Sequence, residues 1–267
     1  MISRIFPQLT RYAWFRRFIW KRLYNRMARS FPTEKWTFMN YGYDYPGEPI
    51  KLDEKDEINR YSIQLYLSLI ERVDFETRNI LEVGSGRGGG SNYIAGKLTT
   101  GQITGMDLAE ASVSFCQKNY QKENLQYVAG NSEKMPFGDS SFDIVINVES
   151  SHAYGSVDNF LGEVNRVLCS SGYFLLADFR DKEGITLLRE QLAQSGLKLI
   201  NEIDITENVI GAIEKEDAIK RDRIRQHIPA WINGLFGEFA GVTGSKVHTN
   251  LVNGALVYYQ FVLQKIE

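Results

Sequence analysis

The chain has 267 residues, of which 43% are hydrophobic and 24% charged, and its formal net charge is −2. This length and composition fit one α/β domain with additions, and the near balance of charge argues against a dedicated nucleic-acid-binding protein, which usually has a clearly basic domain. The two cysteines, Cys116 and Cys169, lie far apart without histidines at metal-ligand spacing. The sequence therefore predicts no disulfide and no metal site, and it favours a reduced, cytoplasmic location.

The first predicted element is a basic, aromatic-rich amphipathic helix over residues 8–29. Residues 1–30 carry eight basic side chains and no acidic one, whereas the rest of the chain carries 23 basic and 33 acidic side chains. The apolar face of this helix consists of Leu9, Tyr12, Phe15, Ile19, Leu23 and Met27. Such a helix either lies on an anionic membrane surface, which would make the protein peripheral to a membrane, or packs over the domain with its arginines in solvent.

A loop rich in Tyr, Gly and Pro over residues 41–49 and a helix at about 55–72 precede a regular alternation of strands and helices. Strands are expected near residues 79–83, 103–106, 125–129, 143–148, 172–177 and 197–204, and helices near 88–97, 109–121, 156–168 and 183–195. This alternation predicts parallel βαβ units in an α/β fold with a doubly wound, Rossmann-like sheet. A last strand over 255–263 makes the sheet seven-stranded.

A helical segment over residues 206–238 interrupts the alternation before the last strand. It is either a lid over a binding site or a structural buttress. The predicted organisation is an N-terminal helical or lid segment (1–72), a Rossmann-like core (73–205), a helical lid insertion (206–250) and the final strand of the core (251–267).

The clearest motif runs from Leu81 to Gly90, Leu-Glu-Val-Gly-Ser-Gly-Arg-Gly-Gly-Gly. A strand ends in an acid, turns through glycines that let the backbone approach a ligand, and opens a helix whose N-terminus favours negative charge. The glycines also satisfy the dinucleotide fingerprint G-x-G-x-x-G. Glu82 favours S-adenosylmethionine instead, because a carboxylate attracts the ammonium group of its methionine part and offers nothing to a pyrophosphate.

Further along the chain, polar residues follow the next strands. Asp107 ends the second strand, 25 residues after Glu82, where a carboxylate accepts from both hydroxyls of a ribose. Asn131 follows the third strand and is expected to accept from the adenine amino group. The predicted cofactor-binding residues are Glu82, Gly84, Ser85, Gly86, Gly88, Asp107, Leu108, Asn131, Ser132, Glu133 and Asn147.

Residues 79–178 resemble class I S-adenosylmethionine-dependent methyltransferases of the small-molecule type. The E-x-G-x-G-x-G loop, the acid after the second strand, the N-x-E-x-M-P-F turn and the S-F-D-x-V strand occur in order. Nearly the whole chain resembles the phthiotriolone and phenolphthiotriolone dimycocerosate methyltransferases, on the segments 38–43, 88–90, 147–152 and 211–215. This resemblance implies an O-methyltransferase that acts on a hydroxyl of a hydrophobic small molecule, such as a lipid, a polyketide or another natural product. Asn131 departs from the aspartate of many relatives, which is expected to weaken adenine recognition.

A hydroxyl must lose its proton as it accepts a methyl group. The pKa of an alcohol is close to that of water, roughly 15.7, so proton removal has to accompany methyl transfer to a base within hydrogen-bond reach. His152, four residues after the fourth strand, is the predicted general base. Glu149 is expected either to orient His152 or to hold the acceptor hydroxyl. The predicted substrate-contacting residues are Tyr43, Tyr154, Trp231 and Phe236.

Three other functions fit parts of the pattern. The segment 149–153 also resembles the E-A-T-C-H-A segment of sterol side-chain methyltransferases, which implies carbon methylation of a sterol-like or isoprenoid acceptor. The glycine loop permits an NAD-dependent oxidoreductase, and the fold alone permits a non-catalytic cofactor-binding module. A nucleic-acid methyltransferase is disfavoured, since no D/N-P-P-Y/F motif follows the fourth strand. The sequence leaves the acceptor and the oligomeric state open.

Overall fold

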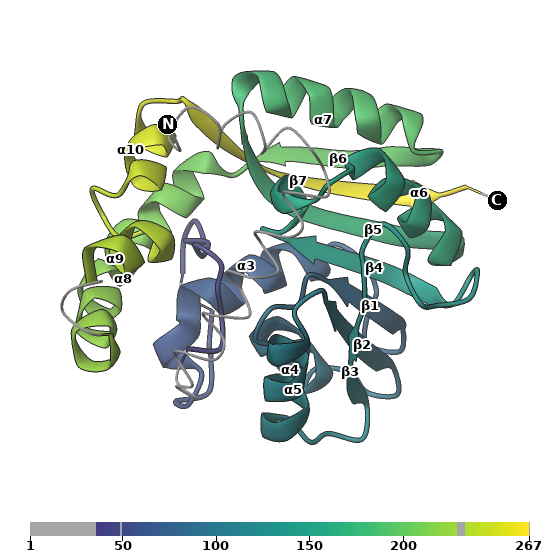
Figure 1. Ribbon diagram of the computed structural model, residues 1–267, viewed down its shortest axis with the longest axis horizontal. Helices are drawn as coiled ribbons and strands as arrows, with labels where there is room; N and C mark the ends of the chain where they lie inside the picture. Colours follow the sequence, from purple (N-terminus) through teal and green to yellow (C-terminus); the bar gives the residue numbers. More distant parts are fainter. Residues whose placement is uncertain (1–35, 49, 229–232, 267) are drawn as a thin grey trace, which may run out of the picture.

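The computed structural model describes residues 36–48, 50–228 and 233–266 (Figure 1). The amphipathic helix predicted over residues 8–29 and the predicted substrate residue Trp231 lie outside these ranges, so both stay predictions. None of the described helices combines the length and the apolarity needed to cross a membrane.

The described residues form a seven-stranded sheet in the order β3-β2-β1-β4-β5-β7-β6. The strands are β1 (Asn79–Val83), β2 (Gln102–Asp107), β3 (Leu125–Ala129), β4 (Phe142–Val148), β5 (Leu168–Asp181), β6 (Leu197–Asp204) and β7 (Leu256–Lys265). β1 to β5 are parallel to one another, whereas β7 runs antiparallel between β5 and β6. The predicted α/β, Rossmann-like class and its seven strands are confirmed.

The helices and two short 3₁₀ turns connect and cover these strands. They are η1 (Glu57–Asn59), α3 (Arg60–Ile70), α4 (Gly89–Ala95), α5 (Glu110–Asn119), η2 (Ser151–Ala153), α6 (Val157–Val167), α7 (Lys182–Gln194), α8 (Thr206–His227), α9 (Asn233–Ala240) and α10 (Lys246–Val252). In Figure 1, α8, α9 and α10 form a helical group at one side of the molecule, next to α3. The strand order reverses between β1 and β4, and such a switch point leaves a crevice at the carboxyl ends of the strands.

Alternate side chains of each strand enter two separate cores. On β1, Ile80 packs with α3 and α4, whereas its neighbour Leu81 packs with α6 and α7. Ile144 and Val145 of β4 divide in the same way. This period of two follows from the pleat of a strand, and burial on both faces explains why these strands are runs of Ile, Leu and Val in the sequence.

The structure differs from the sequence-based prediction in three elements. β5 is longer than the predicted strand over 172–177, because Leu168 pairs with β4 and residues 178–181 pair with β7. The helix predicted over 206–238 is described as two, α8 and α9. The loop predicted before the last strand contains α10, which begins where the Ser245 side chain accepts a hydrogen bond from the backbone N–H of His248.

Residues 37–44 form an extended strap that joins the helices to the sheet. The Tyr43 N–H donates to the Tyr61 carbonyl at 2.9 Å, and the Asp44 N–H donates to the Asn208 carbonyl of α8 at 3.0 Å. The Asp44 carboxylate also pairs with Lys215 of α8 at 2.7 Å. The strap is therefore fixed to both α3 and α8, and it crosses the switch-point crevice.

Candidate active site

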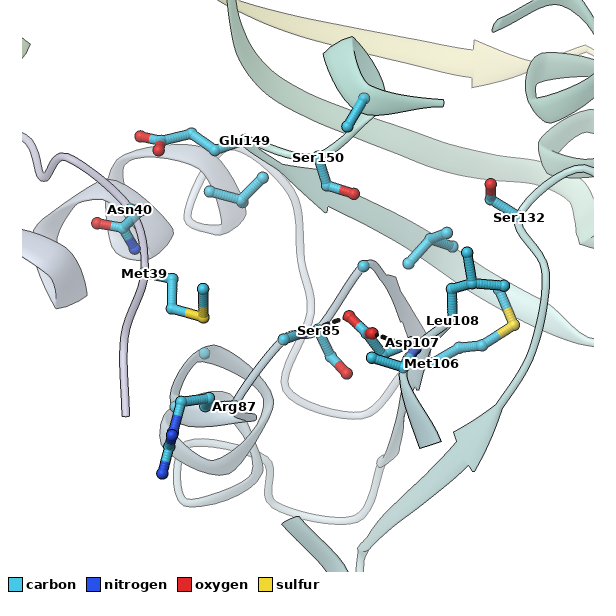
Figure 2. A pocket seen from close by; sticks show the side chains of 18 of the residues that line it. Met39, Asn40, Ser85, Arg87, Met106, Asp107, Leu108, Ser132, Glu149 and Ser150 are labelled. Carbon is cyan, nitrogen blue, oxygen red and sulfur yellow. Dashed lines mark hydrogen bonds between the residues drawn. The ribbon is translucent and has the colours of Figure 1, made fainter. Parts of the chain in front are cut away.

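A cavity lies at the carboxyl ends of β1, β2 and β4, under the strap. Its empty space is about 1020 Å³, open solvent at its mouth included. Figure 2 shows Met39 and Asn40 of the strap on one side and Leu108 and Ser132 on the other. Ten predicted site residues line it: Gly84, Ser85, Gly86, Asp107, Leu108, Asn131, Ser132, Glu133, Glu149 and Tyr154.

The loop after β1 forms the floor of the cavity. Gly84 has a φ of +80°, and a Cβ there would lie 2.0 Å from the Ser150 hydroxyl oxygen, so only glycine fits between β1 and the end of β4. Gly86 also has a positive φ, of +53°. The side-chain hydroxyl of Ser85 is buried against the cavity and has no hydrogen-bond partner within the described part of the chain. A buried polar atom without a partner is uncommon, which suits a site that binds a polar ligand.

Asp107 is the last residue of β2 and lies where the glycine loop after β1 meets the start of α5. Its Oδ2 accepts from the Gly86 N–H and its Oδ1 from the Ala109 N–H, both at 2.8 Å. Burial raises the pKa of Asp107 to about 6, although the two N–H groups oppose this rise. The carboxylate is thus fixed by two backbone contacts on the cavity, and its predicted contact with a ribose stays a prediction.

Glu82 lies behind the cavity and not among the residues that line it. It is fully buried; Tyr66 donates to its Oε1 at 2.5 Å, and the Ser91 hydroxyl donates to its other oxygen. Burial raises the pKa of Glu82. Tyr66, which donates to this carboxyl group, does line the cavity. Glu82 therefore does not reach the cavity wall, where its predicted contact with the ammonium group of the cofactor would form.

Asn147 and Gly88, two other predicted cofactor residues, are also absent from the walls. The Asn147 amide donates to the Val83 carbonyl at 2.8 Å and to the Tyr154 hydroxyl at 2.9 Å, which ties β1 to the segment after β4. A Cβ on Gly88 would lie 2.7 Å from the Cys116 sulfur, so this glycine serves close packing of the loop on α5. Both residues support the walls of the site from behind.

The wall opposite the strap consists of the turn after β3. The Asn131 side-chain oxygen accepts from the Glu133 N–H at 3.1 Å, and the Glu133 carboxylate accepts from the Gly155 N–H at 3.0 Å. The oxygen of Asn131 that was expected to accept from adenine therefore already has one partner within its own turn.

Glu149 is the first residue after β4 and has an unusual backbone. Its φ is +47°, a left-handed backbone conformation that residues other than glycine adopt rarely. Its Oε1 accepts from the Tyr41 N–H at 2.8 Å and from the Tyr258 hydroxyl at 3.0 Å. Burial raises the pKa of Glu149 to about 8, with a smaller opposing effect from these donors. The expectation that Glu149 orients His152 is not met: the described contacts of its carboxyl group are with the strap and β7.

His152 is held by Asp178, a residue that the sequence analysis missed. Its Nδ1 lies 2.8 Å from Oδ1 of Asp178, and its backbone N–H donates to Oδ2 at 3.0 Å. His152 itself does not line the cavity, but Ser150 and Ala153 on either side of it do. The only signal for Asp178 in the sequence is an acid near the end of the fifth strand.

The remaining predicted substrate residues fall in different places. Tyr154 lines the cavity. Tyr43 is buried in the core, where its ring lies 5.1 Å from that of Tyr45. Phe236 is buried in a separate cluster on α9, with the Trp36 ring 5.0 Å away. Neither Tyr43 nor Phe236 lines the cavity.

The strap supplies a wall that the sequence analysis did not assign to the cofactor site. Thr37, Phe38, Met39 and Asn40 line the cavity. The Thr37 carbonyl accepts from the Gly89 N–H at 3.1 Å, which closes the strap onto the glycine loop. The signal was present, since the segment 38–43 is one of those on which the resemblance to the lipid methyltransferases rests.

Comparisons with known proteins agree with this geometry. Residues 81–176 match the family described as methyltransferase domain. The chain is 35% identical over 248 residues to the phthiotriol/phenolphthiotriol dimycocerosates methyltransferase of Mycobacterium tuberculosis, covering 92% of each chain. It is 38% identical over 223 residues to the fatty-acid O-methyltransferase of Mycolicibacterium smegmatis, covering 79% of this chain and 81% of that one.

Among solved structures, the geranyl diphosphate C-methyltransferase of Streptomyces coelicolor has the same fold. The TM-score is 0.66 and the sequence identity 13%, with 92% of this chain and 97% of that one covered. The methyltransferase relatives, the glycine loop and the position of Asp107 together support S-adenosylmethionine as the cofactor. The chain belongs to the class I S-adenosylmethionine-dependent methyltransferases, in the family of the phthiotriol and phenolphthiotriol dimycocerosates methyltransferases.

Proposed function

We propose that this methyltransferase acts on a hydroxyl group of a hydrophobic, lipid-like acceptor, with His152 as the general base. The relatives named for phthiotriol dimycocerosates and for fatty acids support the lipid class.

The cavity fits the cofactor of the family. The glycine loop, the free hydroxyl of Ser85 and the carboxylate of Asp107 provide, in this order, a close backbone, a donor and an acceptor of hydrogen bonds. When bound, S-adenosylmethionine supplies a methyl group on a positively charged sulfur. The residues of the chain then have two tasks, to hold the acceptor oxygen in line with this methyl group and to remove its proton.

The observation that carries the proposal is the position of His152. It lies in η2 directly after the carboxyl end of β4, between two residues that line the cavity. Its Nδ1 is bonded to Asp178, whereas its Nε2 has no hydrogen-bond partner among the described residues. As the acceptor oxygen takes the methyl group and the methyl–sulfur bond breaks, the hydroxyl proton would pass to Nε2 and later to solvent, and S-adenosylhomocysteine would leave.

Glu149 has the position of a group that holds the acceptor. Its Oε1 is occupied by two donors, whereas its Oε2 has no partner among the described residues. Since Glu149 lines the cavity, Oε2 is available to the acceptor hydroxyl. Of the two roles expected for Glu149, we therefore propose that it holds the acceptor hydroxyl, and not that it orients His152.

The test is a methyl-transfer assay with labelled S-adenosylmethionine and three acceptors: a long-chain secondary alcohol, a fatty acid and geranyl diphosphate. We expect label in an ether of the alcohol. We expect His152→Ala to bind S-adenosylhomocysteine normally and to turn over at least about a hundredfold more slowly. His227→Ala, at the end of α8, is the matched control and is expected to keep full activity.

Other outcomes would replace the proposal. Label on a carbon atom of geranyl diphosphate would make the chain a C-methyltransferase, and label only in a fatty-acid ester would exclude the need for a base. Full activity of His152→Ala would remove His152 from the mechanism. Binding of the cofactor without turnover of any acceptor, in an assay that includes a lipid extract, would favour a non-catalytic module.

A further inference from the structure

Asp178 contacts His152 at two points, which is unusual for a chance surface pair. The residue lies near the carboxyl end of β5 and is fully buried. Its Oδ1 is 2.8 Å from the ring nitrogen Nδ1 of His152, and its Oδ2 accepts from the backbone N–H of the same histidine at 3.0 Å. One carboxylate therefore fixes both the main chain of η2 and the imidazole that η2 carries.

The surroundings keep this carboxylate ionised. Oδ2 also accepts from the Ser151 hydroxyl at 2.6 Å and lies 3.1 Å from Nη1 of Arg180. Burial alone would raise the pKa of Asp178, but the charge of Arg180 and the contacts with His152 outweigh it and hold the pKa well below its usual range. Arg180 in turn donates to the Ser151 hydroxyl at 2.8 Å, so it contacts both Asp178 and the segment that carries His152.

An ionised carboxylate only accepts hydrogen bonds. The ring nitrogen that faces it must therefore carry the hydrogen, and the lone pair of the neutral imidazole is on Nε2. The ring of Phe179 lies 4.5 Å from the imidazole and limits its rotation. Tautomer and orientation are both fixed before any acceptor arrives.

We propose that Asp178 is the positioning residue of the reaction, which holds His152 in the Nδ1–H tautomer with Nε2 free to take the acceptor proton. This inference rests on the proposed function. Among the described residues, the titratable and charged groups around the imidazole are Asp178 and Arg180 from β5 and, farther away, Glu149 from the end of β4, whose ionised form interacts electrostatically with Asp178. Of these, only Asp178 bonds the ring.

Asp178→Asn gives a prediction specific to this geometry. The Oδ2 side of the group faces three donors, and the Oδ1 side faces two, the His152 ring N–H and the Phe179 N–H at 2.9 Å. The amide oxygen is expected to take the side with three donors. Its NH₂ group then faces Nδ1, which has to become an acceptor, and the hydrogen of the imidazole moves to Nε2.

The experiment is ¹⁵N NMR of the full chain labelled at histidine, combined with kinetics. Wild-type His152 is expected as the Nδ1–H tautomer and the Asp178→Asn variant as the Nε2–H tautomer. The variant is expected to lose at least a hundredfold in kcat, with KM for the acceptor and affinity for S-adenosylhomocysteine within about twofold of wild type. The matched control is Asp181→Asn on the same strand, whose carboxylate accepts from the Gly184 N–H at the start of α7 and which is expected to change neither readout.

The outcomes separate this inference from the proposed function. Full activity of His152→Ala overturns the proposed function, whatever Asp178→Asn does. Loss of activity in His152→Ala together with full activity in Asp178→Asn overturns only the positioning role. An Nε2–H tautomer in the wild-type protein also overturns it, and this measurement stands even if Asp178→Asn does not fold.

Discussion

At the scale of single residues, two of the acids that line the cavity, Asp107 and Glu149, differ in the groups that bond to them. Asp107 accepts from two backbone N–H groups and has a pKa of about 6, whereas Glu149 accepts from one N–H and one hydroxyl and has a pKa of about 8. In both cases burial is the largest cause. At neutral pH Asp107 is mostly ionised and able to accept, as the predicted contact with ribose hydroxyls requires, while Glu149 mostly keeps its proton and is able to donate.

Asp107→Asn is expected to weaken binding of S-adenosylhomocysteine at least about tenfold, or roughly 1.4 kcal/mol. The amide removes the charge and leaves one of the two N–H groups without an acceptor. Isothermal titration calorimetry measures the effect. Asp143→Asn is the matched control, because Asp143 also accepts from a backbone N–H, that of Asn79 at 2.9 Å, but at the amino end of β1. Equal affinities of the two variants would contradict the ribose assignment.

The prediction for Asp107 depended only on the end of a strand and a fixed distance from the glycine loop, and Asp107 does line the cavity. Glu82 does not line it, and the pattern does not reveal that Tyr66 of α3 donates to its carboxyl group. Asp178 was missed for a related reason. A single acid at a strand end becomes informative only when the fold brings η2 against it.

At the scale of elements, the strap of residues 37–44 closes one side of the cavity. It is anchored to the glycine loop through Thr37 and Gly89, and to the end of β4 through Tyr41 and Glu149. No periodicity marks such a segment, since it is neither a helix nor a strand. The sequence predicted a loop only over residues 41–49, and the path of residues 37–40 along the cavity follows from contacts with residues far along the chain.

Gly89→Ala tests the strap, since a Cβ there would lie 2.6 Å from the Thr37 carbonyl oxygen and 2.9 Å from the Phe38 ring. The strap has to move away, so we expect weaker binding of S-adenosylhomocysteine and faster hydrogen exchange in residues 37–44. Gly162→Ala on α6 is the matched control, because nothing lies within 4 Å of its Cβ. It is expected to leave the affinity unchanged and to stabilise the fold by roughly 0.5–1 kcal/mol. Unchanged exchange in Gly89→Ala would show that the strap does not close the site.

At the scale of the whole molecule, the fold was the most predictable property. Short β-branched runs that alternate with helical patterns predict the strands and their parallel arrangement. The reversed direction of β7 and its place between β5 and β6 were not predicted, because strand order depends on pairing between distant segments. The two described helices that follow α8 were equally hard to delimit, since both are short.

The stability of the molecule is expected to depend on pH through Glu149. Its pKa is raised from 4.5 to about 8, so the native state holds a proton that the unfolded chain releases. The stabilisation is complete below pH 4.5 and is lost as pH rises toward 8, with a slope of up to about 1.4 kcal/mol per pH unit. Asp107 adds to the decrease only up to about pH 6.

Urea unfolding between pH 6.5 and 8 is the measurement. The free energy of unfolding of the wild type is expected to fall across this range, and that of Glu149→Gln to fall less. The amide oxygen of Gln is still able to accept from Tyr41 and Tyr258, so the comparison isolates the proton. Parallel curves for the two proteins would mean that Glu149 is ionised in the native state.

The place of β7 has a consequence for how the protein is made. β6 has no strand partner in the sheet other than β7, and Tyr258 of β7 donates to Glu149 in the cavity. A nascent chain emerges from the ribosome at about 5–20 residues per second, and until β7 is synthesised the edge of β5 and the whole of β6 have unpaired backbone groups. Such edges pair readily with other chains. The emerging protein therefore needs protection from aggregation until its last strand arrives, and the same strand completes the wall around Glu149.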